Sequence, residues 1–185
     1  TRNAAKSFSY ACVPTDIIEV LTLAGWKYRH ELKATDIVYS YNSETDDIEV
    51  DVVRGIVEFD DKPIIVLSNG IDTFESTEDH RWYGLQHKND LEYSFFTTKE
   101  ITPDTVILNS RDGDTITESF GYEVINILPS RPTFCITTNN STFLIRQHKK
   151  YVSITGNCMY GAQPEKLAKM LRISLKEAEK LYESY

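Results

Sequence analysis

Three residues of the chain carry side chains that can break and remake peptide bonds without a cofactor. Cys12 and Cys158 have thiols, and Asn157 has a side-chain amide directly before the second thiol. A cysteine thiol is partly ionised near neutral pH and is intrinsically nucleophilic, so it can convert a neighbouring amide to a thioester and back. An asparagine amide nitrogen can attack its own backbone carbonyl, which forms a succinimide and cuts the chain. The pattern therefore predicts two scissile junctions, Ala11–Cys12 and Asn157–Cys158.

The segments outside these junctions read as one interrupted sequence. Joining residue 11 to residue 158 gives RNAAKSFSYACMYGAQPEKLAKML, in which cationic and aromatic residues recur at every fourth position: Arg2, Lys6, Tyr10 and Tyr160. Four-residue spacing places side chains along one face of a helix. Cations suit the phosphates of a nucleoside triphosphate, and aromatic rings suit its base and sugar. Because this stripe exists only when residues 12–157 are removed, the sequence predicts an insertion.

The joined sequence resembles the fingers-helix motif of family A DNA polymerases, in which an Arg and a Lys are followed by an aromatic residue and then Tyr-Gly. The resemblance covers all of the flanking residues. It implies that Arg2 and Lys6 contact an incoming triphosphate, that Tyr10 lies at the sugar-discriminating position, and that Tyr160-Gly161 closes the motif. DNA and a deoxynucleoside triphosphate are therefore expected partners of the joined polymerase only.

Motifs inside the insert resemble those of inteins in the Hint superfamily. Thr77-Glu78-Asp79-His80 is similar to the Thr-x-x-His element of that family, which implies that His80 protonates the departing amide nitrogen and that Thr77 strains or polarises the first scissile peptide. TFCITTNNSTFLI resembles a later block, with Cys135 where many members have Asp. That match implies that Cys135 positions or activates Cys158. The alternative is that Cys135 packs as a small buried hydrophobe.

Two departures from the family pattern concern the second junction. Most inteins end in His-Asn, whereas Gly156 precedes Asn157 here, and the block around Cys135 lacks the usual histidine before its Phe. The nearest candidate to assist cyclisation of Asn157 is His148, in the basic stretch Arg146-Gln147-His148-Lys149-Lys150. The alternative is that this stretch is a solvated loop.

The expected reaction is autocatalytic and needs no cofactor, no metal and no partner beyond the flanks in cis. Cys12 attacks the carbonyl of Ala11, Cys158 takes over the N-terminal segment, and Asn157 cyclises to release residues 12–157. An acyl shift then leaves a normal peptide bond between Ala11 and Cys158. Since every step is intramolecular, proximity supplies much of the rate. The fold has to bring residues 12 and 157 side by side.

The elements that must position these residues read as strands between helical flanks. Short β-rich runs with turn signals between them fill the middle of the chain: DIVYSYN, IEVDVVRGIVEF, PIIVLSNGIDTF, YEVINIL, TFCITT and TFLI. Asn69-Gly70 predicts a hairpin and Asp112-Gly113 a further turn. Residues 16–33 fit either a helical turn or two strands around Gly25. Residues 159–185 have helical apolar spacing, with a capping box from Ser174 to Glu177.

These patterns, taken with the resemblance, predict an all-β, horseshoe-like Hint domain with short helical flanks. The expected organisation is a polymerase flank at 1–11, a splicing domain at 12–157 and a second polymerase flank at 158–185. The insert is too short for an added homing-endonuclease domain, which indicates a mini-intein.

Composition limits the other classes of protein. The net charge is −8, and because residues 1–11 carry +2 and residues 158–185 carry +1, the insert carries −11. So acidic an insert argues against phosphate binding by that segment. No apolar run approaches the roughly 20 residues of a bilayer span, and the N-terminal residues lack the apolar core of a secretory signal. We therefore expect no membrane partner and a cytoplasmic location.

Three rival interpretations stay open at this point. A hedgehog-like domain would cleave without joining, against which the rejoinable flanks argue. A metal-binding or nucleic-acid-binding module would use three thiols and one imidazole as zinc ligands, those of Cys12, Cys135, Cys158 and His80. No Cys-x-x-Cys pair supports this interpretation. Oxidation could also join two of the thiols and block the reaction, which a reducing cytoplasm disfavours.

Overall fold

The structure, a computed structural model, describes residues 12–110, 115–157, 174, 176 and 177. Its strands are β1 (Val13–Pro14), β2 (Ile18–Thr22), β3 (Gly25–Tyr28), β4 (Ile37–Asn42), β5 (Asp47–Val52), β6 (Gly55–Phe59), β7 (Ile64–Ser68), β8 (Thr73–Ser76), β9 (Arg81–Leu85), β10 (Ser94–Thr97), β11 (Val106–Asn109), β12 (Thr117–Ser119), β13 (Glu123–Leu128), β14 (Thr133–Thr137), β15 (Thr142–Gln147) and β16 (Tyr151–Gly156). Short 3₁₀ turns lie at η1 (Arg29–Glu31) and η2 (Thr98–Glu100). The all-β prediction is confirmed.

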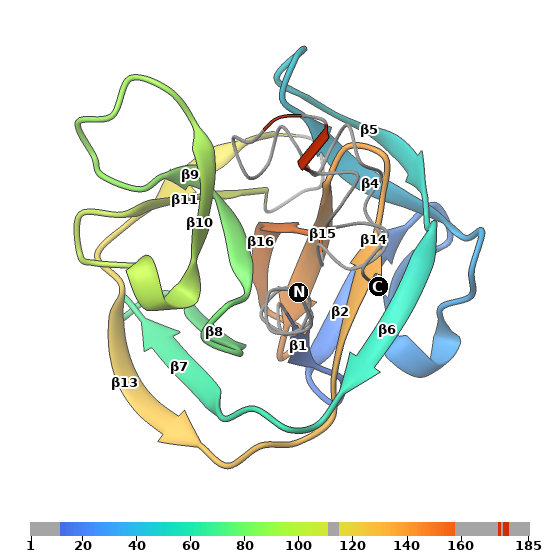
Figure 1. Cartoon of the computed structure of the whole chain (residues 1–185), viewed down its shortest axis with the longest axis horizontal. Coiled ribbons are helices and arrows are strands. Elements are labelled where there is room, and N and C mark those ends of the chain that lie inside the picture. The colour runs from blue at the N-terminus through green and yellow to red at the C-terminus, as the bar shows by residue number, and fades with distance from the viewer. Residues whose placement is uncertain (1–11, 111–114, 158–173, 175, 178–185) are drawn as a thin grey trace.

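The strands pair into three sheets within the described residues. The largest follows the order β12-β11-β9-β16-β15-β2-β4-β5, with β10 on β9 and β3 on β2. The other two have the orders β1-β14-β6 and β13-β7-β8. In Figure 1, β13, β7 and β6 follow one another around the rim of the molecule, whereas β1, β15 and β16 lie near its middle. This curled arrangement gives the expected horseshoe-like outline.

The Asn69-Gly70 sequence closes the hairpin between β7 and β8, as predicted. Gly70 has φ +85°, a left-handed conformation that glycine adopts without steric cost. The Asn69 side-chain oxygen accepts hydrogen bonds from the backbone N–H groups of Ile71 (3.0 Å) and Asp72 (2.7 Å). The turn is therefore stabilised by its own asparagine, a common role for this residue.

Residues 16–33 form two strands around Gly25, followed by the short 3₁₀ turn η1. β2 and β3 pair around Gly25, which has φ +102°. The Thr22 hydroxyl donates to the Gly25 carbonyl (2.6 Å) and accepts from the Ala24 N–H (3.1 Å), which stabilises the tight connection. The run IEVDVVRGIVEF also divides, because β5 pairs with β4 while β6 pairs with β14 in another sheet.

Several predictions concern residues outside the described part of the chain. They are the flank at 1–11, the turn at Asp112-Gly113 and most of the helical flank at 158–185. Within that second flank Lys176 and Glu177 are helical, and the Glu177 N–H donates to the Ser174 hydroxyl (3.2 Å), which is one half of the expected capping box. Among the described residues, no helix has the length and apolarity to cross a bilayer.

The core joins the two described cysteines to a group of aromatic side chains. Phe74 packs against Trp82 and Tyr122, with ring centroids 5.2 Å and 5.6 Å apart. Cys12 and Cys135 belong to the same buried cluster, and both are fully buried. The first junction therefore begins inside the hydrophobic core, where water is excluded.

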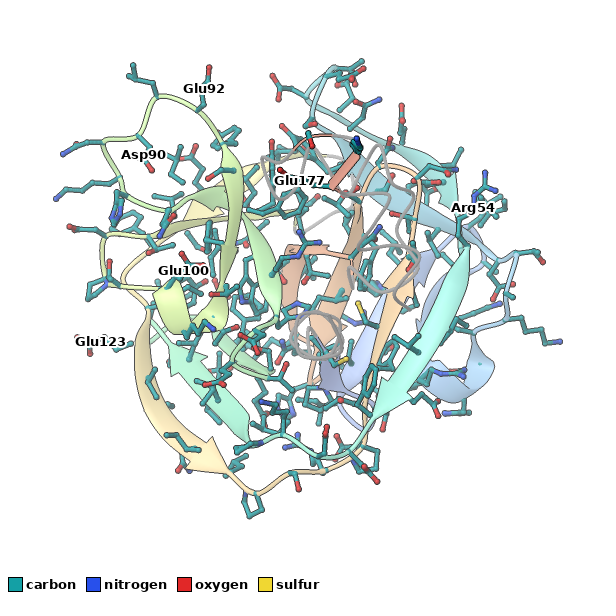
Figure 2. All side chains as sticks on the ribbon, in the orientation of Figure 1. Arg54, Asp90, Glu92, Glu100, Glu123 and Glu177 are labelled. Atoms are coloured by element: carbon teal, nitrogen blue, oxygen red, sulfur yellow. The ribbon has the colours of Figure 1, made fainter. Side chains whose placement is uncertain are left out.

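Some acidic side chains lie on the outside of the molecule and some are buried. Figure 2 shows Asp90, Glu92 and Glu123 at its periphery, and all three are exposed. Glu19, Asp51 and Glu75 are buried instead.

Candidate active site at the two junctions

Thr77 holds the backbone of Cys12 with three hydrogen bonds. The Cys12 N–H donates to the Thr77 hydroxyl oxygen (3.1 Å), and the Cys12 carbonyl accepts from both the Thr77 N–H (3.0 Å) and the Thr77 hydroxyl (3.2 Å). Thr77 opens the turn that connects β8 to β9. Because the Cys12 nitrogen belongs to the first scissile peptide, this contact fixes the plane of the bond that must break.

His80 closes the same turn and is fully buried. Its N–H donates to the Thr77 carbonyl (3.2 Å), and its own carbonyl accepts from the Thr98 N–H (2.9 Å). The imidazole packs edge-on against Trp82, with ring centroids 4.8 Å apart, and its Nε2 atom is hydrogen-bonded to the Thr155 hydroxyl. Backbone and ring are thus held from several sides, so the ring has one orientation.

The hydrogen bonds of Thr155 determine the tautomer of His80. The Thr155 hydroxyl donates its single proton to the Arg81 carbonyl (3.1 Å), which can only accept. The same oxygen must then accept from His80 Nε2, so Nε2 carries a proton. Nδ1 is consequently the position at which this imidazole gains or gives up its exchangeable proton, as a general acid or base requires.

β14 places Cys135 opposite Cys12. The register pairs Val13 with Phe134 and Pro14 with Thr133, and one further step of this antiparallel ladder sets residue 12 against residue 135. Directly opposed residues in such a ladder have Cβ atoms about 4.5–5.5 Å apart. The structure therefore places Thr77 in hydrogen-bond contact with Cys12 and puts Cys135 in the same buried cluster, while His80 lies three residues after Thr77 at the end of the same turn.

Asn157 follows β16 directly, and Thr138 holds its side-chain amide. Asn157 Nδ2 donates to the Thr138 carbonyl (2.9 Å), while the Thr138 N–H donates to Asn157 Oδ1 (3.1 Å). The Thr138 hydroxyl also lies 3.1 Å from Asn157 Oδ1, but its single proton is shared with a nearer acceptor, the Thr142 carbonyl (2.7 Å). A backbone N–H can only donate and a carbonyl can only accept, so these contacts establish which amide atom is nitrogen. The Asn157 N–H also donates to the Ser141 carbonyl (2.9 Å). The nucleophilic nitrogen is therefore buried and oriented.

Arg81 contacts the second junction and is a functional residue that the sequence analysis missed. Its Nη2 atom donates to the backbone carbonyl oxygen of Asn157 at 2.6 Å, and its guanidinium lies 4.7 Å from the centroid of the Phe95 ring. The signal was its position directly after His80. Successive residues of a strand point to opposite faces, so the histidine of the Thr-x-x-His element faces Thr155 while the next residue reaches Asn157.

The tyrosines near Arg81 stay uncharged. Tyr83 packs against Phe95 with ring centroids 4.9 Å apart, and burial raises its pKa. Burial and a hydrogen bond to Asp46 raise the pKa of Tyr41, and a hydrogen bond to Glu118 followed by burial raises the pKa of Tyr93 to about 12. These phenols are therefore uncharged at neutral pH.

The structure does not bring His148 to Asn157. In the β15–β16 hairpin Gln147 pairs with Tyr151 at one end and Thr142 with Gly156 at the other, so His148 lies at the turn, about 17 Å along the strand from the junction. Its Nε2 atom lies 2.6 Å from the buried carboxylate of Glu75. This placement corrects the expectation that His148 assists the cyclisation.

The remaining predicted site residues lie outside the described part of the chain: Ala11 and Cys158 at the junctions, and Arg2, Lys6, Tyr10 and Tyr160 in the flanks. Among the described residues, no group of three or more His, Cys, Asp or Glu side chains is placed to hold a metal ion. The zinc interpretation therefore gains no ligand set from this part of the chain.

Several solved structures with the same fold are inteins. A GSH-linked, splice-inactive variant of the AceL NrdHF class 3 split intein matches 80% of this chain and 99% of its own, with a TM-score of 0.66 at 14% identity. A DnaB intein from Synechocystis sp. PCC 6803 matches 79% and 97%, with a TM-score of 0.59 at 14% identity. The fold is that of the inteins.

An intein from a hyperthermophile has the same intein fold, with a TM-score of 0.57 at 15% identity over 79% of this chain and 99% of its own. No protein-family model and no curated protein sequence matches the chain. At identities this low the likeness establishes the intein fold alone, which confirms the predicted Hint-type architecture. The chemistry has to be argued from the side chains described above.

Proposed function

We propose that the chain is a protein-splicing element, in which residues 12–157 excise themselves and join Ala11 to Cys158. One observation carries the proposal. The backbone of Cys12 and the side-chain amide of Asn157 are each held by a dedicated threonine, Thr77 and Thr138, at buried positions beside β14. An ordinary core needs neither arrangement, whereas splicing needs both.

The first step is transfer of the N-terminal flank to the Cys12 sulfur. The bond from Cys12 Sγ to the Ala11 carbonyl carbon forms, the peptide C–N bond breaks, and the thiol proton ends on the Cys12 nitrogen. Thr77 orients that nitrogen, and the Nδ1 atom of His80 serves as the proton donor. Positioned proton transfer of this kind contributes about 10²–10⁴-fold to a rate.

The second step moves the flank from Cys12 to Cys158. Cys135 lies at the register position opposite Cys12, so its sulfur is suited to orient or activate the incoming thiol. A Cys135→Ala variant should still form the first thioester but pass it on more slowly. The measurement is the ratio of thiol-induced N-terminal cleavage to joined product, and an unchanged ratio would leave Cys135 as a packing residue.

The third step is cyclisation of Asn157. The Asn157 Nδ2 atom attacks the carbonyl carbon of its own residue, and the peptide bond to Cys158 breaks. The Thr138 carbonyl accepts from Nδ2 and so holds the nucleophile in place. This arrangement favours splicing over a hedgehog-like reaction, which would cleave without joining.

The host of the element is proposed to be a family A DNA polymerase. The support is the stripe Arg2, Lys6, Tyr10 and Tyr160, which forms one helical face only after joining. The joined chain would then bind DNA and a deoxynucleoside triphosphate through these residues, and the element itself would need no other partner. A reducing cytoplasmic setting would keep its thiols available.

Mass spectrometry of the freshly expressed chain under reducing conditions tests the proposal, with Cys12→Ala and Asn157→Ala variants beside it. The parent should yield the released insert together with residues 1–11 joined to 158–185, and both variants should yield no joined product. An intact 21.2 kDa chain in every sample would overturn the proposal. If the Cys12→Ala variant still joined residues 1–11 to 158–185, the first nucleophile would be another residue. Cys135, the thiol opposite position 12, would be the candidate.

A further inference from the structure

The space beside Gly156, where most inteins carry a histidine side chain, is already filled. A Cβ atom built on Gly156 would lie 3.0 Å from Phe95 Cε1, 3.1 Å from Phe95 Cδ1 and 3.1 Å from Arg81 Cβ. These distances are shorter than ordinary van der Waals contacts, which begin near 3.4 Å. A side chain at this position therefore requires Phe95 or Arg81 to move.

Phe95 is held firmly in that space. It lies on β10 opposite Tyr83 of β9, and the two rings meet edge-on with centroids 4.9 Å apart. Its other neighbour is the Arg81 guanidinium, 4.7 Å from the ring centroid, a distance at which a cation is attracted to the face of an aromatic ring. The glycine, the ring and the guanidinium thus form one packed unit.

The guanidinium is directed at the carbonyl that reacts. Arg81 is only 7% exposed, and its Nη2 atom lies 2.6 Å from the Asn157 carbonyl oxygen. Hydrogen bonds from charged donors are the strong ones, and exclusion of water strengthens them further. When Asn157 Nδ2 adds to this carbonyl carbon, the oxygen becomes negatively charged at the position that Arg81 already contacts.

We propose that Arg81 is a catalytic residue of the Asn157 cyclisation. Gly156 and Phe95 position it, because the absence of a side chain at position 156 leaves room for the Phe95 ring that contacts the guanidinium. The inference rests on the proposed function. The Nδ2–C bond forms, the C–N bond to Cys158 breaks, and one Nδ2 proton ends on the amine of Cys158. Arg81 keeps its own protons and stabilises the oxyanion between the two events.

The packing of Gly156, Phe95 and Arg81 predicts an effect of substitution that comparison with intein sequences would not suggest. Gly156→His restores the usual intein ending, yet it should slow cleavage of the Asn157–Cys158 bond, because the new side chain displaces the Phe95 ring and with it the guanidinium. Gly156→Ala should slow cleavage less. Combining Gly156→His with Phe95→Ala, which opens the space, should recover part of the loss.

The experiment uses the full 185-residue chain and follows each junction separately by mass spectrometry. Release of residues 158–185 reports the cyclisation, and thiol-induced release of residues 1–11 reports the first thioester. Arg81→Gln should slow the cyclisation about 100-fold, the usual cost of removing one oxyanion donor. Thiol-induced release at the first junction should stay within about threefold of the parent.

Chemical rescue separates catalysis from structural support. In Arg81→Ala, millimolar guanidinium should accelerate release of residues 158–185 at least fivefold, whereas urea, which has nearly the same shape but no charge, should not. Arg81→Gln cleaving as fast as the parent would overturn the proposal. So would equal losses at both junctions without guanidinium rescue. A parent chain that cleaves at neither junction would instead refute the proposed function itself.

Discussion

The two junctions are held in different ways. At the first, one four-residue element supplies the contacts, since Thr77 holds the Cys12 backbone and His80 lies three residues further on. At the second, the contacts come from separate parts of the chain, because Thr138 follows β14 and Arg81 begins β9. The first site can be recognised as a short motif, whereas the second exists only once distant strands are packed.

Two hydrogen bonds of Thr155 link the two sites. Thr155 lies two residues before Asn157 on β16 and contacts His80 Nε2 as well as the Arg81 carbonyl. Residues that share a hydrogen-bond network have non-additive effects when they are changed. Variants that affect one junction more than the other therefore test whether the two sites are as distinct as their contacts indicate.

His80→Ala should produce the largest difference in cleavage rate between the two junctions. Loss of the proton donor should slow thiol-induced release of residues 1–11 by about 10²–10⁴-fold, the range for a positioned acid or base. Release of residues 158–185 should fall much less, because Arg81 and Thr138 remain in place. The two rates are compared on the same sample, and equal losses at both junctions would contradict the separation.

Thr155→Val tests the link between the sites. Without the hydroxyl nothing holds the proton on His80 Nε2, so the first junction should slow by about tenfold, roughly 1.4 kcal/mol of transition-state stabilisation. Thr155→Ser keeps the hydroxyl and should restore most of the rate. If Thr155→Ser is as slow as Thr155→Val, packing of the threonine methyl group matters rather than the tautomer.

Thr138→Val should affect the second junction alone and more mildly. It removes the hydroxyl whose single proton is shared between the Thr142 carbonyl (2.7 Å) and Asn157 Oδ1 (3.1 Å), but the backbone contacts to the amide remain. One such hydrogen bond contributes about 1 kcal/mol, which corresponds to about fivefold in rate. Release of residues 158–185 measures it, with Thr138→Ser as the matched control.

His148→Ala should have the smallest effect, within about twofold at either junction. Its ring contacts Glu75 at the far end of the β15–β16 hairpin, and the ring is itself 46% exposed. The free energy of unfolding should fall by about 1 kcal/mol, as for the loss of one side-chain hydrogen bond. A large loss at the second junction would return His148 to the reaction and disfavour Arg81.

The sequence predicted the features that depend on neighbouring residues. The Asn69-Gly70 hairpin is local, because turn-forming residues determine it, and Thr77 and His80 were identified through the resemblance of one short motif to the Thr-x-x-His element. The roles of Arg81 and Thr138 are not local, since they arise from the register of β9, β14 and β16. The sequence also did not explain why Gly156 replaces the histidine that most inteins carry before the final Asn. The Phe95 ring that occupies the space beside Gly156 comes from β10, far away in the sequence.

Among the described strands, β1 pairs with β14, whose residues follow it by more than a hundred positions. During synthesis on a ribosome, Cys12 therefore emerges long before the strand that pairs with its neighbours. In the proposed reaction, this topology would delay the first step until β14 has been synthesised and most of the insert exists.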